Sequence, residues 1–157
     1  MARAIMAGLI NYPSLLARQH DAISQLPLGD EQLEKLRTVV LDAAFASSTL
    51  EKDSLQAILY NAGLGVVAEE LRTTNALAFS FLRSNADPKR AEQDLSAAIE
   101  ALAMLPRLDV ALAEIKGRFG AATDAADWAE QQRLLSARNA AEDALKVLSS
   151  GEDELGV

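Results

Sequence analysis

The apolar positions of residues 87–149 have the spacing of two amphipathic helices joined by a turn. In the first half, large apolar residues recur at steps of three and four, which places them on one helical face. They are Leu95, Ile99, Leu102, Leu105, Leu108, Leu112, Ile115 and Phe119. Asp87 can cap the start, and Pro88 fits the first helical position, where its missing N–H is not needed. This pattern predicts a long helix beginning at Pro88.

The turn that follows is marked by its own residues. Gly120 comes directly after the last apolar position, and a glycine there commonly ends a helix. Thr123 or Asp124 can then cap a second helix that runs to about Ser149. Residues 87–149 are therefore predicted to fold as helix, tight turn, helix.

Pro106 interrupts the first of these helices. A proline inside a helix removes a backbone hydrogen bond and clashes with the preceding turn, at a cost of about 3 kcal/mol. We therefore expect a kink or break near residues 104–106. It divides the chain into a helical bundle, residues 1–105, and a C-terminal hairpin, residues 106–157, whose acidic tail should fray.

Residues 1–84 carry shorter helical patterns separated by turn signals. The residue before Pro13 avoids helical dihedrals, so one helix should end near Asn11 and another begin at Pro13. The further predicted helices are 31–46 with Asp30 as its cap, 54–63 ended by Gly63, 65–73, and 75–84. In the last of these, Leu77, Phe79, Phe81 and Leu82 crowd around most of a turn, which predicts a central position.

No segment alternates apolar and polar residues for long enough to predict a strand. The fold class is therefore predicted to be all-α, with a bundle of five or six short helices, a long kinked helix and a C-terminal helical hairpin. The composition agrees, since 50% of the 157 residues are apolar but only 4% are aromatic, and alanine and leucine predominate.

Cysteine and long apolar runs are both absent from the sequence. Without cysteine there can be no disulfide, thiolate metal site or cysteine nucleophile, which fits a reducing compartment. No apolar run of about 18 residues predicts a membrane span, and no signal peptide is indicated. We expect a soluble, cytoplasmic protein.

The net charge of −8 is unevenly distributed, because residues 85–157 alone carry −6. An acidic surface repels phosphate backbones, so we expect no direct binding of nucleic acid. A protein partner is favoured instead.

Residues suited to catalysis are few. His20 is the only histidine, and no nucleophile is paired with it in the sequence. The carboxylate pairs Glu69–Glu70 and Asp124–Asp127 have spacings that solvated helix faces and caps commonly show. One histidine without cysteine makes a zinc site improbable. We predict no catalytic residue, no metal and no cofactor.

The second helix of the hairpin carries the candidate partner-binding residues. Trp128, the only tryptophan, either packs the hairpin turn onto the bundle or onto Ile115 and Phe119, or it anchors a partner. Arg133 and Arg138 either pair with Glu130 and Glu142 or belong to a contact face. The apolar positions of this helix form a seam for the first, and they are Leu134, Ala137, Ala141, Ala144, Leu145 and Leu148.

The opening RAIMAGLINYPSLL, an apolar helix followed by an Asn-aromatic-Pro break and a leucine pair, resembles the start of the C-terminal domain of bacterial DnaG-type DNA primases. The resemblance is most specific at residues 8–16. LRTVVLDAAF and SLQAILYNAGL are similar to helices of that domain's bundle. EIKGRFGAATDAADWAEQQRLLSARNAAEDAL is similar to its terminal hairpin.

That resemblance implies a non-catalytic module that docks on the replicative hexameric helicase, DnaB in most bacteria. Its bundle would modulate the helicase, and its hairpin would supply most of the grip. The chain would then be the C-terminal piece of a longer primase, monomeric or weakly dimeric alone. The hairpin positions implied as partner-binding are Trp128, Arg133, Leu134, Arg138, Leu145 and Leu148.

Three alternatives remain open at this stage. The N-terminal collar domain of the replicative helicase has a related helical architecture and would self-associate into rings. A small all-α enzyme would need a pocket with convergent polar groups. A helical adaptor would dimerise through the apolar stripe that includes Leu108, Leu112, Ile115 and Phe119.

Overall fold

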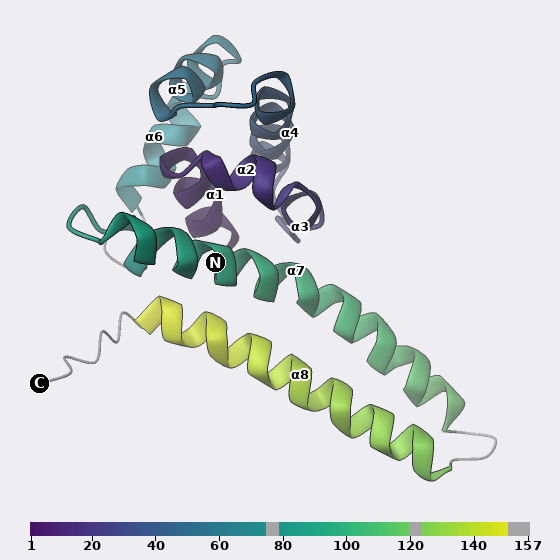
Figure 1. The fold of residues 1–157 in the computed structure, drawn as a ribbon. Coiled ribbons are helices and arrows are strands. Elements are labelled where there is room, and N and C mark those ends of the chain that lie inside the picture. The colour runs from purple at the N-terminus through teal and green to yellow at the C-terminus, as the bar shows by residue number, and fades with distance from the viewer. Residues whose placement is uncertain (75–78, 120–123, 151–157) are drawn as a thin grey trace, which may run out of the picture.

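The computed structural model describes residues 1–74, 79–119 and 124–150. Its elements are α1 (Ala2–Asn11), α2 (Ser14–Arg18), α3 (His20–Ser24), α4 (Glu31–Ala46), α5 (Lys52–Asn61), α6 (Gly65–Thr74), the short 3₁₀ helix η1 (Ser80–Leu82), α7 (Pro88–Arg118) and α8 (Ala125–Ser150). These described residues contain no strand, so the predicted all-α class is confirmed. Figure 1 shows α7 lying between the bundle of short helices and α8.

Helix α1 is the centre of the bundle. Every residue from Ala4 to Ile10 is buried. Gly8 permits the close approach of α1 to α7, because a methyl group at this position would lie 2.8 Å from Leu95 Cδ1 and 3.1 Å from Phe81 Cδ2. The missing side chain at Gly8 therefore lets Leu95 and Phe81 pack directly against α1.

The predicted helix over residues 75–84 is wrong in its described part. Phe79 has an extended backbone, only Ser80–Leu82 form a 3₁₀ turn, and Arg83 is extended again. Phe79 and Phe81 stack with ring centroids 5.5 Å apart, and both are buried. Residues two apart on an α-helix do not face each other, so this stack requires a different backbone. Leu77 lies outside the described residues.

Helix α7 runs unbroken through Pro106, so of the two predicted alternatives, a kink or a break, the break is wrong. One proline removes one hydrogen bond from a helix of 31 residues. The apolar side chains on both sides of it are held by packing. Leu102 and Leu105 pack against the core of the bundle, and Leu108 is buried beyond it.

The predicted helix starts are confirmed by their capping bonds. Asp30 Oδ1 accepts from the Gln32 backbone N–H at 2.8 Å, and Asp87 Oδ1 accepts from that of Lys89 at 3.3 Å. Asp124 caps α8 by accepting from the Asp127 N–H at 2.9 Å. The segment after Pro13 forms two short helices in place of one. Gly120, Thr123 and the acidic tail lie outside the described residues.

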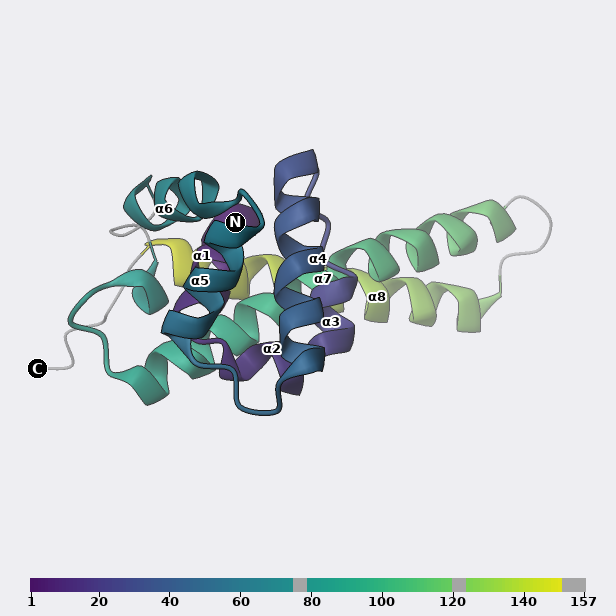
Figure 2. The same cartoon turned by 90° about the horizontal axis from the view of Figure 1, so that it is seen from above.

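The buried apolar residues fall into two clusters of very different size. The larger one contains the core of the bundle, the first half of α7, and Ala141 and Leu145 of α8. The smaller one consists of Leu108, Leu112, Ile115 and Leu134, from α7 and α8 alone. In both views the parts of α7 and α8 that form this smaller cluster project past the bundle (Figures 1 and 2). We call residues 108–119 and 124–138 the hairpin end.

Among the described helices, none combines the length and the apolar character needed to cross a bilayer.

Candidate partner-binding site at the hairpin end

An aromatic pair lies at the outermost part of the hairpin end. The rings of Phe119, just after α7, and Trp128, in the first turns of α8, stack with centroids 5.1 Å apart and planes 25° apart. Of the packing alternatives for Trp128, the structure therefore shows the one on Phe119. Trp128 nevertheless keeps 54% of its surface exposed. A half-exposed tryptophan held in place by a second ring loses little side-chain freedom when another protein covers it.

An ion pair supports the same part of the hairpin. Arg118 Nη1 lies 3.8 Å from Asp127 Oδ1 and so connects the last turn of α7 to the first turn of α8. Asp124, which caps α8, lies three residues before Asp127 in the sequence. Both carboxylates of the predicted Asp124–Asp127 pair thus have structural roles.

Arg133 makes a two-point contact with Glu130 one turn earlier on α8. Its Nε and Nη2 atoms donate to the two carboxylate oxygens at 2.9 and 2.5 Å. The bond to Arg133 lowers the pKa of Glu130, and the bond to Glu130 raises the pKa of Arg133. The Arg133 side chain is largely exposed and that of Glu130 is partly exposed, so the guanidinium is presented to solvent in a fixed direction.

Arg138 joins the two helices of the hairpin. Its Nε atom donates to Asp109 Oδ1 of α7 at 2.7 Å, and its Nη1 atom lies 2.6 Å from Glu142 Oε1 on α8. The hydrogen bond to Asp109 and the charge of Glu142 raise the pKa of Arg138. The sequence indicated the pairing with Glu142, but the bond to Asp109 depends on how the two helices are aligned.

The three leucines implied as partner-binding lie on the inner side of α8. Leu134 is buried in the smaller cluster, and Leu145 is buried in the larger one. Leu148 is half-buried and packs against the larger cluster. These side chains hold α8 on α7. Of the implied residues, only Trp128 and Arg133 present most of their surface to solvent, and Arg138 is partly exposed.

The hairpin end carries almost no net charge, although the whole chain carries −8. Its five acidic and four basic residues leave a charge of −1. An interface here would therefore depend on the aromatic pair and on individual guanidinium groups, and only weakly on long-range attraction.

The remaining candidate groups occupy ordinary surface positions. His20 is exposed at the start of α3, with Nδ1 3.7 Å from Asp21 Oδ1. Glu69 pairs with Arg72 at 3.0 Å. In the described residues no cluster of three or more His, Cys, Asp or Glu side chains is arranged to hold a metal ion.

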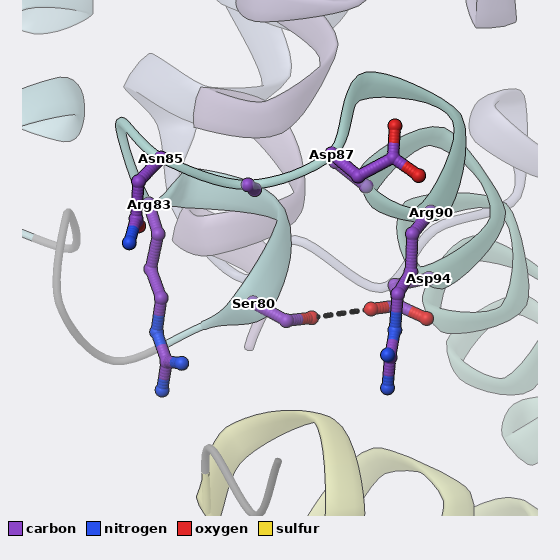
Figure 3. A pocket seen from close by; sticks show the side chains of 8 residues that line it. Ser80, Arg83, Asn85, Asp87, Arg90 and Asp94 are labelled. Atoms are coloured by element: carbon purple, nitrogen blue, oxygen red, sulfur yellow. Dashed lines mark hydrogen bonds between the residues drawn. The ribbon is translucent and has the colours of Figure 1, made fainter. Parts of the chain in front are cut away.

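A polar pocket lies between η1 and the start of α7 (Figure 3). The Ser80 hydroxyl donates to Asp94 Oδ2 at 2.6 Å, and Arg83 and Arg90 extend toward the same side of this bond. The volume of the pocket, about 210 Å³, is below the range of typical small-molecule sites. The Ser80–Asp94 bond fastens the turn around η1 to α7.

Comparison of the chain with models of protein families, with curated proteins and with solved structures found no match.

Proposed function

We propose that this chain is a non-catalytic docking module of a bacterial primase that binds the replicative hexameric helicase through the hairpin end. The primase resemblance of the sequence supplies the identity of the partner. The observation that carries the proposal is the Phe119–Trp128 stack, a half-exposed aromatic pair at the end of a projecting helical hairpin. In this assignment the module brings the primase to the unwound strand without taking part in catalysis.

The contact face consists of the exposed members of the implied set. Trp128 provides the apolar anchor, and Arg133, held by Glu130, provides a separate directed cation further along α8. Arg138 and the buried Leu134 and Leu145 act indirectly, since they fix the pairing of α7 with α8. Leu148, packed near the base of the hairpin, has the same supporting role.

Dimerisation through the stripe on α7 is less compatible with this fold. Leu108, Leu112 and Ile115 are buried against the chain's own α8. A second copy could reach them only if the hairpin opened. The collar alternative predicts self-association into rings, which sedimentation of the purified chain would detect.

The proposal is tested by titrating the full chain into the hexameric replicative helicase of the source organism. We expect micromolar or tighter binding and a loss of about tenfold or more with Trp128→Ala. Arg133→Gln should weaken binding by a smaller factor. Phe45→Ala, at a 90% exposed position on α4, is the matched control and should bind as the wild type does.

Point variants are preferable to deleting residues 122–157. Ala141 and Leu145 belong to the larger core, so the deletion would uncover α7 as well as remove the contact face. If Trp128→Ala binds the helicase as tightly as the wild type does while Phe45→Ala also binds normally, the hairpin end is not the contact.

A further inference from the structure

Two arginine side chains extend from the polar pocket of Figure 3 toward α8. Arg83 follows η1 and is half-buried, and Arg90 lies in the first turn of α7 and is exposed. In Figure 3 both guanidinium groups reach past the bond between Ser80 and Asp94 in the direction of the α8 ribbon. Two cations from different parts of the chain are thus directed at the same region.

The two carboxylates of this pocket have hydrogen bonds within the fold. Asp87 accepts from the Lys89 backbone N–H at 3.3 Å as the cap of α7, and its side chain points away from α8 in Figure 3. Asp94 accepts from the Ser80 hydroxyl at 2.6 Å. It lies one turn from Arg90 and offsets part of the positive charge. The side of the pocket toward α8 therefore presents mainly the ends of the two guanidinium groups.

The alignment of α7 with α8 shows where the chain leaves α8. Arg138 bonds to Asp109 at 2.7 Å across these antiparallel helices, so each residue forward on α8 matches one residue back on α7. Ser150, the last residue of α8, comes twelve residues after Arg138 and is level with Ala97, twelve residues before Asp109. Arg90 lies seven residues further back, about 10 Å along the axis at 1.5 Å per residue.

The sequence directly after Ser150 is acidic. The segment GEDELGV contains Glu152, Asp153 and Glu154 and no basic residue. Two to four residues of extended chain span at most about 7 to 14 Å, to which the length of the side chains is added. The three carboxylates are therefore within reach of the guanidinium groups.

We infer that the acidic residues 152–154 bind Arg83 and Arg90 of the same chain and form a strap that fastens the end of α8 to η1 and to the first turn of α7. The strap holds the base of the hairpin, at the opposite end of α8 from Trp128. It also occupies the arginine pair with carboxylates of the chain itself, which excludes other acidic ligands. The inference does not depend on the proposed helicase docking.

The tether favours the chain's own tail over other anions. A segment joined to its site by a few residues has an effective concentration in the millimolar range. A second copy of the chain, or an acidic segment of another protein, has to compete from free solution. Phosphate backbones are disfavoured further, because the chain carries a net charge of −8.

The test uses a single spin label on the full chain. The sequence contains no cysteine, so Val157→Cys provides one site for a nitroxide, which broadens the amide signals of residues close to it. We expect strong broadening at residues 80–94. The double variant Arg83→Gln, Arg90→Gln should lower the added relaxation rate there by about threefold or more, because the opposite charges that hold the tail are gone. The triple variant Glu152→Gln, Asp153→Asn, Glu154→Gln should have the same effect.

Matched controls separate loss of charge from loss of fold. Arg72→Gln removes an arginine that is paired with Glu69 on α6, and it should leave the broadening unchanged. The double variant Arg83→Lys, Arg90→Lys keeps both charges and should retain most of the broadening. Amide signals of α1 at their wild-type positions show that the bundle is intact in each variant.

Equal broadening at residues 80–94 in the wild type and in the double glutamine variant, with α1 unchanged, would overturn the inference. So would broadening that appears when spin-labelled chains without an isotope label are mixed with isotope-labelled chains without a spin label. The arginine pair would then bind the tail of a second copy.

Discussion

The two halves of α7 bury leucines of the same kind in very different surroundings. Leu95 is wholly buried and contacts the surface of α1 at Gly8, inside the larger cluster. Leu112, which is 7% exposed, belongs to a cluster of four residues formed by α7 and α8 only. The stabilisation that a buried leucine provides depends on how many neighbours enclose it, so a helix continuous in its backbone need not be uniform in its stability.

That difference distinguishes the bundle, which supports the hairpin, from the hairpin end, which carries the proposed contact face. In α7 the hairpin end extends about 15 Å beyond Leu108, at 1.5 Å per residue, and it is stabilised by one helix–helix interface. The bundle is stabilised by helices packed on several sides of α1. A docking element of this design can open or adjust locally while the bundle remains folded.

The largest expected effect is the difference between Leu95→Ala and Leu112→Ala. Leu95→Ala should lower the free energy of unfolding by about 3 to 5 kcal/mol, because the surrounding core cannot collapse into the cavity. Leu112→Ala should cost about 2 kcal/mol and should mainly increase opening of the hairpin end. Urea denaturation measures the first effect, and amide hydrogen exchange over residues 108–118 measures the second.

Equal global destabilisation by the two variants, with no local change in exchange, would mean that the hairpin end unfolds together with the bundle. The distinction between the two regions would then be lost.

A smaller effect is expected from the cross-hairpin pair of Arg138 and Asp109. Both side chains are partly exposed, so the pair should contribute little to overall stability. Asp109→Asn should accelerate amide exchange at the hairpin end by about two- to fivefold and leave α1 unchanged. If Arg138→Gln accelerates exchange in the Asp109→Asn background by the same factor as it does in the wild type, the two residues are not coupled.

The smallest effect concerns Glu130, whose pKa is lowered chiefly by its hydrogen bond to Arg133. A lowered carboxyl pKa means that the bond stabilises the folded hairpin at pH values above the ordinary glutamate pKa of about 4.3. This contribution is lost as the pH falls through the lowered pKa. Carboxyl NMR titration should place Glu130 below its ordinary pKa. Arg133→Gln should return it toward that value, and an unchanged pKa in the variant would contradict the assigned cause.

Features that depend on residues close in sequence were predictable. The caps at Asp30, Asp87 and Asp124 each involve a backbone N–H two or three residues away, so local sequence contains the whole interaction. The Arg133–Glu130 contact is of the same kind. The predicted pair of amphipathic helices from Pro88 onward was also correct, because its apolar period is long and regular.

Features that depend on how elements pack were missed. The stack of Phe79 on Phe81 overrides the helical pattern, and packing on both sides of Pro106 keeps α7 continuous. The sequence could not distinguish the seam of Leu134 and Leu145 from a contact face, since both are apolar stripes on one helix. Their burial is decided by the position of α7.

The measurement that tests the central claim most directly is amide hydrogen exchange of the full chain with and without the hexameric helicase. The account predicts added protection at the hairpin end, centred on residues 118–119 and 124–133, with α1 unchanged. Added protection confined to the bundle, with no change around Trp128, would contradict it.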